Sequence, residues 1–141
     1  MRILSPFLRR GLVAGACVAT AFAVHAQASP AGALPPMKGE GAARYVCGGV
    51  GLDESTALRA AMKDHPLSLL LARSDGAYLA NVDVVIKNAK GDPALALQAD
   101  GPVCLIDLPP GRYTVEASAR DTTKRQSVTV GRGAKTVDFR F

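Results

Sequence analysis

The chain has 141 residues, with 17 basic and 12 acidic side chains and a net charge of +5 at neutral pH. Three of the basic residues lie near the N-terminus, and the others form no run interleaved with aromatic residues, so the composition gives no support to nucleic-acid binding. A chain of this length is expected to form one domain rather than two.

Residues 1–28 have the pattern of a secretory signal peptide. Three arginines precede an apolar stretch at 11–24, and Ala26 and Ala28 are the small residues that signal peptidase requires. The apolar stretch is shorter than a membrane-spanning helix, which needs about 20 residues. We therefore expect cleavage after Ala28, or as second choice after Ala26. The mature protein would then be periplasmic or secreted, with 14 basic and 12 acidic residues and no membrane span.

Cys17 leaves an alternative open for the N-terminus. Gly15 and Ala16 are small residues, as they are before the lipid-modified cysteine of bacterial lipoproteins. However, Ala14 stands where those proteins have a larger aliphatic residue. Removal of the whole signal peptide is therefore the preferred interpretation, and lipid anchoring at Cys17 is the alternative.

Residues 29–44 differ in composition from the rest of the mature chain. They contain three prolines and three glycines without hydrophobic periodicity, which predicts a flexible or extended lead-in. The folded domain is expected to span residues 45–141.

The sequence GGVG at 48–51 lies between strand-forming residues and a predicted helix, an order that is also found in phosphate-binding loops. A dinucleotide-binding loop has a further glycine at a fixed spacing, and a P-loop has a lysine, but neither is present here. Two carboxylates directly after the loop also place negative charge where a phosphate would bind. We therefore interpret Gly48, Gly49, Gly51 and Asp53 as a structural corner, in which glycine permits positive φ.

Residues 53–64 predict one short helix. Asp53 is the expected N-cap, and Leu58 and Ala61 lie at helical spacing on one apolar face. A proline shortly after the helix ends it, because proline disfavours helical geometry in the residue before it.

The chain after this helix alternates between apolar and polar residues in short segments bounded by glycine, proline or aspartate. Seven strands are predicted, at 67–73, 82–88, 94–99, 103–108, 112–119, 125–130 and 135–141. Because most strands have one polar face and no long helix is available for parallel crossovers, we expect antiparallel pairing. The predicted fold class is an all-β sandwich or barrel with one short N-terminal helix.

The apolar faces of the helix and the strands are expected to form a single core. The residues predicted to be buried together are Leu58, Val84, Ile86, Leu108, Tyr113, Val115, Val128, Val137 and Phe139.

The turn at Pro109, Pro110 and Gly111 precedes the strand in which Tyr113 lies. The prolines cannot continue a strand ladder, and Gly111 permits a tight reversal of the chain. A tyrosine just inside a strand after such a turn often hydrogen-bonds back to the backbone of the turn.

The segment DGPVCLIDLPPGRYTVEA (100–117) resembles the carboxypeptidase regulatory-like, or transthyretin-like, domain family. Together with CGGVGLDE (47–54) it is similar to small exported proteins of proteobacteria that carry this domain, over about 45–141. The resemblance implies an antiparallel, seven-stranded sandwich of immunoglobulin-like or prealbumin-like type. It implies no known activity.

No catalytic site, cofactor site or metal site is predicted in the mature chain. His65 is its single histidine, whereas catalytic zinc sites commonly use two or more. The transthyretin-like hydrolases use several histidines and a C-terminal tyrosine motif, but this chain ends DFRF. No serine lies in a G-x-S-x-G motif. We therefore predict that the protein is not an enzyme.

Cys47 and Cys104 are the cysteines that remain after signal cleavage. Outside the cytoplasm an even pair of cysteines usually forms a disulfide. The sequence does not show whether the two Cα atoms come within bonding distance, so it does not decide between a disulfide and two free thiols.

Together these features predict a non-catalytic binding or accessory domain of the bacterial envelope, which contacts a protein, a peptide or a glycan. A carbohydrate-binding module is the alternative, and a small transthyretin-type hydrolase is less favoured because the histidines are missing. Tryptophan is absent, so Tyr78 is the best candidate for a side chain that stacks on a sugar. Whether Tyr78 is exposed or packed discriminates between these hypotheses.

Overall fold

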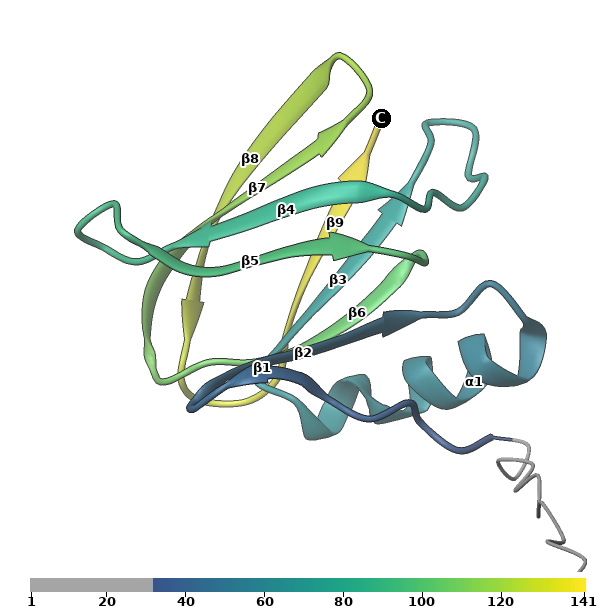
Figure 1. The fold of residues 1–141 in the computed structure, drawn as a ribbon, viewed down its shortest axis with the longest axis horizontal. Coiled ribbons are helices and arrows are strands. Elements are labelled where there is room, and N and C mark those ends of the chain that lie inside the picture. The colour runs from purple at the N-terminus through teal and green to yellow at the C-terminus, as the bar shows by residue number, and fades with distance from the viewer. Residues whose placement is uncertain (1–31) are drawn as a thin grey trace, which may run out of the picture.

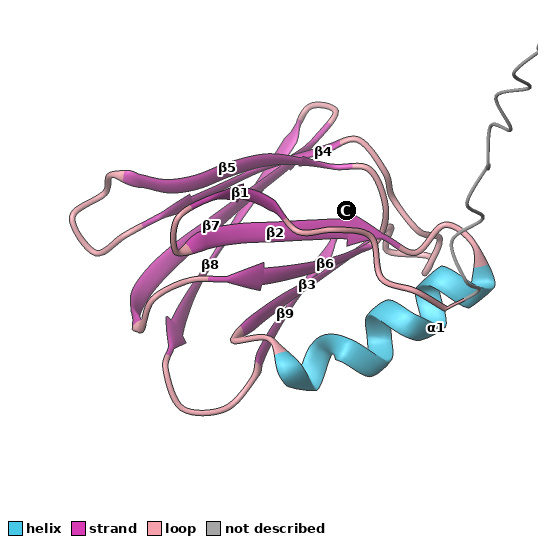
Figure 2. Cartoon of the chain, turned by 60° about the horizontal axis from the view of Figure 1, so that its bottom comes forward, coloured by secondary structure: helices cyan, strands magenta, loops and turns pink. Residues whose placement is uncertain are grey.

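A computed structural model describes residues 32–141 of the chain; the predicted signal peptide and Cys17 lie outside these residues. The described chain forms three layers, with a four-stranded sheet (sheet B), a five-stranded sheet (sheet A) and a helix on the outer face of sheet A (Figures 1 and 2). The elements are β1 (Lys38–Glu40), β2 (Ala43–Gly48), α1 (Leu52–Ala61), the 3₁₀ helix η1 (Met62–Asp64), β3 (Leu67–Ala72), β4 (Val82–Lys87), β5 (Pro93–Ala99), β6 (Val103–Asp107), β7 (Gly111–Ala119), β8 (Thr122–Val130) and β9 (Lys135–Arg140).

The order of strands is β1-β2-β6-β3-β9 in sheet A and β5-β4-β7-β8 in sheet B. Neighbouring strands are antiparallel with one exception. Strands β3 and β9 are parallel, from Leu67 opposite Lys135 to Ala72 opposite Arg140. The expectation of purely antiparallel pairing is therefore wrong. A parallel pair needs a long connection, and the strands from β4 to β8 supply it here in place of a crossover helix.

Residues 32–141 contain nine strands, whereas seven were predicted. The additional strands, β1 and β2, form a hairpin at the N-terminal end of the domain. All three residues of β1 are exposed, so this strand has no apolar periodicity by which the sequence could reveal it. From Lys38 onward the lead-in predicted for 29–44 is therefore extended and paired, not flexible, and the folded domain begins before residue 45.

The core between the two sheets contains most of the residues that were predicted to be buried together. Seven of the nine lie in it, namely Val84, Ile86, Leu108, Tyr113, Val115, Val137 and Phe139. Val128 is only half-buried, because β8 is an edge strand of sheet B. Leu58 is fully buried but belongs to a separate cluster.

This second cluster lies between α1 and the other face of sheet A. Leu58 and Ala61 of the helix pack there with Val46, Val103 and Leu105. The central strands of sheet A are therefore covered on both faces. Their sequences, LSLLLA in β3 and VCLID in β6, are accordingly almost continuously apolar instead of alternating.

Helix α1 begins at Leu52, and its N-cap is Gly51. The backbone of Gly51 is extended (φ −85°, ψ 153°), and its carbonyl accepts a hydrogen bond from Ser55 N at 2.8 Å. The prediction of Asp53 as N-cap is therefore wrong, although Asp53 lies in the first turn, where its charge suits the helix dipole. No helix within the described part of the chain is long and apolar enough to cross a membrane.

Candidate functional site

The glycine corner (Gly48, Gly49 and Gly51) connects the end of β2 to the start of α1. Gly49 has a φ of +94°, which side chains rarely adopt, and a Cβ added to it would lie 3.3 Å from Val103 Cγ2. A Cβ added to Gly48 would collide with the carboxylate of Glu54. A phosphate site would need open backbone N–H groups and positive potential at this corner. The negatively charged carboxylate of Glu54 lies beside that backbone instead, so the corner does not suit a phosphate.

Gly101, in the loop between β5 and β6, also belongs to this corner, although the sequence did not indicate it. A Cβ on Gly101 would collide with the carbonyl group of Gly48 and lie 2.7 Å from its Cα. Two backbone segments approach each other here without side chains between them. Gly51 differs from these glycines, because no atom lies within 4 Å of a Cβ added to it. Its φ is also negative, whereas that of Gly49 is positive.

Gly49→Ala is expected to lower the free energy of unfolding by about 1 kcal/mol or more, because alanine is strained at positive φ. Gly51→Ala is the matched control, and we expect it to change the stability by less than about 0.5 kcal/mol because its extended backbone accommodates alanine. Urea denaturation of both variants measures the difference. Equal losses at the two positions would contradict the structural interpretation of Gly49. So would a saturable rise in melting temperature with millimolar ATP, NAD or phosphate that Gly49→Ala abolishes.

The turn after β6 is closed by a tyrosine side chain. The Tyr113 hydroxyl donates a hydrogen bond to the Pro109 carbonyl oxygen at 2.7 Å, as the sequence predicts. Gly111 is the first residue of β7. Gly48 pairs with Val103, the first residue of β6, whereas the turn at Pro109 comes after Asp107, the last residue of β6. The glycine corner and the turn therefore lie at opposite ends of one strand and do not form a common site.

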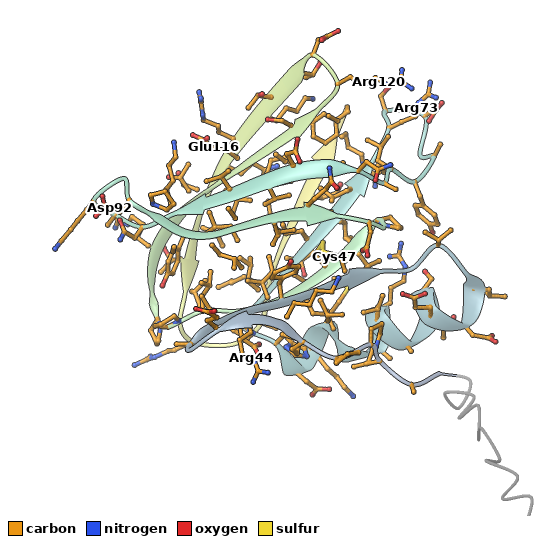
Figure 3. All side chains as sticks on the ribbon, in the orientation of Figure 1. Arg44, Cys47, Arg73, Asp92, Glu116 and Arg120 are labelled. Carbon is orange, nitrogen blue, oxygen red and sulfur yellow. A yellow bond between two sulfur atoms is a disulfide. The ribbon has the colours of Figure 1, made fainter. Side chains whose placement is uncertain are left out.

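Cys47 and Cys104 form a disulfide, which settles the alternative left open by the sequence. They lie directly opposite each other on β2 and β6, with their Cα atoms 4.1 Å apart. Both side chains belong to the core between the sheets, and Cys47 is seen there in Figure 3. The bond joins neighbouring strands of sheet A covalently and is buried.

His65 contacts Asp107, with Nδ1 of the imidazole 2.7 Å from Oδ1 of the carboxylate. The contact joins the segment before β3 to the end of β6, and both groups are partly buried. Because the contact connects two elements of the fold, we interpret His65 and Asp107 as a structural polar pair. Between residues 32 and 141 no group of three or more His, Cys, Asp or Glu side chains could hold a metal ion.

Glu116 lies on the outer face of sheet B between two cations from neighbouring strands (Figure 3). Its Oε1 is 2.7 Å from Arg125 Nε and 3.1 Å from Lys87 Nζ. Hydrogen bonds from Arg125, and then from Lys87, hold the pKa of Glu116 below its usual value. Glu116 is therefore ionised at neutral pH and acts as an ion-pair partner, not as a proton donor.

Tyr78 lies in the loop between β3 and β4, and 58% of the residue is exposed. The loop around it is ordered by its own hydrogen bonds. An isolated β-bridge joins Ala72 to Tyr78, Arg73 N donates to Ala77 O at 2.7 Å, and Ala77 N donates to Asp75 Oδ1 at 3.0 Å. The exposed ring is thus carried by a structured segment of backbone.

A cavity of about 250 Å³ lies beside this ring, and we call it the Tyr78 cavity. Helix α1, the β3–β4 loop, the β5–β6 loop and β9 contribute to its wall, through Arg59, Gly76, Tyr78, Pro102 and Arg140 together with residues 70–72 of β3. Tyr78 was a candidate from the sequence. The two arginines were missed, since they are distant in the chain and no motif connects them.

Comparisons with known proteins do not assign the chain to a family. No family model matches it, and no curated protein matches it. The resemblance to carboxypeptidase regulatory-like domains therefore rests on the residues quoted above.

Proposed function

We propose that the chain is an exported, non-catalytic binding domain of the bacterial envelope, which contacts its partner through the surface around Tyr78. The observation that carries this proposal is an exposed aromatic ring on a hydrogen-bonded loop beside a cavity. Tyrosine and arginine are the side chains on which binding energy often concentrates, and concave surfaces are preferred for small ligands. Because the loop is already ordered, little conformational entropy is lost on binding.

The buried disulfide supports the exported location. Disulfides form and persist in oxidising environments such as the periplasm and the extracellular space, and they are rare in the cytosol. The bond between Cys47 and Cys104 is therefore consistent with the signal peptide that the first 28 residues predict.

We further propose that the domain belongs to the carboxypeptidase regulatory-like, or transthyretin-like, group in its prealbumin-like form. The seven predicted strands correspond to β3 through β9, and they divide into β6-β3-β9 and β5-β4-β7-β8. An immunoglobulin constant domain places its first, second, fifth and fourth strands in one sheet. Here the first of the seven strands, β3, lies instead in one sheet with the fourth, β6, and the seventh, β9. This division favours the prealbumin-like alternative over the immunoglobulin-like one.

Photocross-linking from position 78 tests the proposed binding surface. The full chain is produced in bacterial cells with p-benzoylphenylalanine in place of Tyr78, or in place of Asp83 as the control. Asp83 is exposed on β4 and does not line the Tyr78 cavity. We expect light-dependent adducts from position 78 and none from position 83. Absence of adducts from position 78, or equal adducts from both positions, would contradict the proposal.

A glycan is the second candidate partner, and the exposure of Tyr78 favours it. A packed tyrosine could not serve as a platform for a sugar ring, whereas more than half of Tyr78 is accessible. The charges around this ring indicate which kind of glycan the cavity would accept.

A further inference from the structure

The Tyr78 cavity is lined by positive and neutral groups. Two guanidinium groups, from Arg59 and Arg140, and the phenol of Tyr78 contribute the polar side chains of its wall, and no carboxylate is among the lining residues. The remaining lining residues are apolar or glycine. Such a wall presents hydrogen-bond donors and positive charge, which suit an anionic ligand.

Arg59 is held beside the aromatic ring. Its guanidinium carbon lies 5.6 Å from the centroid of the Tyr78 ring, and its Nη2 donates a hydrogen bond to the Tyr78 hydroxyl at 3.3 Å. Arg59 takes part in none of the ion pairs found within residues 32–141. It therefore brings an uncompensated charge to the cavity. A planar guanidinium matches the geometry of a carboxylate, which it can bind through two parallel hydrogen bonds.

Arg140 contributes differently, because it is already paired. Its Nε lies 2.9 Å from Oδ1 of Asp138, and its Nη2 lies 3.1 Å from Oδ2. This double contact compensates the charge of Arg140 and orients its guanidinium. Arg140 thus supplies oriented donors, whereas Arg59 is the group expected to distinguish a charged ligand from a neutral one.

We infer that the Tyr78 cavity binds a single carboxylate-bearing sugar unit of an acidic glycan, with the carboxylate on Arg59 and the sugar ring against the exposed part of Tyr78. This inference rests on the proposed function, since it uses the same surface. The aromatic ring favours a sugar over an acidic peptide, because the apolar C–H face of a pyranose packs on a flat ring. The cavity of about 250 Å³ is smaller than sites for drug-sized ligands, which occupy about 300–1,000 Å³. It therefore suits one ring of a longer chain.

Isothermal titration calorimetry with tri-galacturonic acid and its methyl ester tests the inference. The protein is purified from the envelope of cells that produce the full chain. The ester keeps the sugar rings and removes the negative charges, so we expect the acid to bind at least tenfold more tightly. The affinity for the acid should also fall as the salt concentration rises. Acetylated tri-glutamate carries carboxylates without a sugar ring, and it should bind at least tenfold more weakly than the acid saccharide.

Three substitutions connect this binding to the cavity. Arg59→Met removes the charge but keeps an apolar stem of similar length, and it should make the acid and the ester bind equally. Tyr78→Ala should weaken the binding of both saccharides. Arg44→Met is the matched control, because Arg44 is exposed on β2 and does not line the cavity; it should leave the preference for the acid unchanged. Circular dichroism melts establish that each variant is folded.

Several results would overturn the inference. These are equal affinity of the wild-type protein for the acid and the ester, tighter binding of the acidic peptide than of the saccharide, and a preference for the acid that survives Arg59→Met. Adducts from position 78 without binding of any saccharide would refute the glycan inference and leave the proposed function intact. Failure of the cross-linking as well would refute both.

Discussion

Replacing Cys47 and Cys104 together by alanine is expected to lower the free energy of unfolding by about 4 kcal/mol. The disulfide joins residues with a sequence separation of 57, and in the chain-entropy model a cross-link of that span destabilises the unfolded state by about this amount. Both side chains also belong to the core between the sheets, so their truncation removes some apolar contact. Urea denaturation of the wild-type protein and the double variant measures the loss.

Reduction provides an independent control for this prediction. Unfolding of the wild-type protein in excess dithiothreitol should show nearly the same stability as the double variant, because both lack the cross-link. Mass spectrometry of the purified protein should show a chain two hydrogen atoms lighter than its reduced form. A loss below about 1 kcal/mol in the double variant would mean that the bond contributes little beyond the pairing of β2 with β6.

The strands could be predicted where one face of a strand is buried and the other is solvated. Strands β4, β7 and β9 follow this pattern, and their inward residues form the core as expected. Strand β1 could not be predicted, because its three residues are exposed and only its pairing with β2 defines it. The parallel pairing of β3 with β9 joins the first and last of the predicted strands, and no local pattern encodes a contact of that range.

The site features also divide into those that the local sequence predicts and those that depend on contacts between distant segments. The hydrogen bond from Tyr113 to Pro109 spans four residues, so turn chemistry alone predicts it. The cysteines could be named as partners, but only the register of β2 against β6 brings them together. The Tyr78 cavity depends on Arg59 from the helix and Arg140 from the last strand. These side chains meet through tertiary packing alone, so the sequence revealed the tyrosine and not its charged neighbours.

Phe139→Ala is expected to lower the free energy of unfolding by about 3–5 kcal/mol. Phe139 lies on β9 opposite Leu71 of β3, and it is among the largest fully buried side chains. Its truncation loses the transfer free energy of the ring and leaves a cavity between the sheets. Single domains are commonly stable by only about 5–15 kcal/mol, so the alanine variant could fail to fold. Phe139→Leu removes less of the side chain and should therefore lose less stability than Phe139→Ala, so it supplies a second measurement.

Phe141→Ala is the matched control, and the comparison tests the register of β9 on β3. Phe141 lies two residues further along, with its ring centroid 6.3 Å from that of Phe139, but it is only partly buried. We expect less than half the loss found for Phe139→Ala, because less apolar area is removed from water. Side chains alternate between the two faces of a strand, so a shift of β9 by one residue would turn both phenylalanines away from the core. Small and similar losses at the two positions in urea denaturation would therefore show that the register of β9 on β3 is wrong.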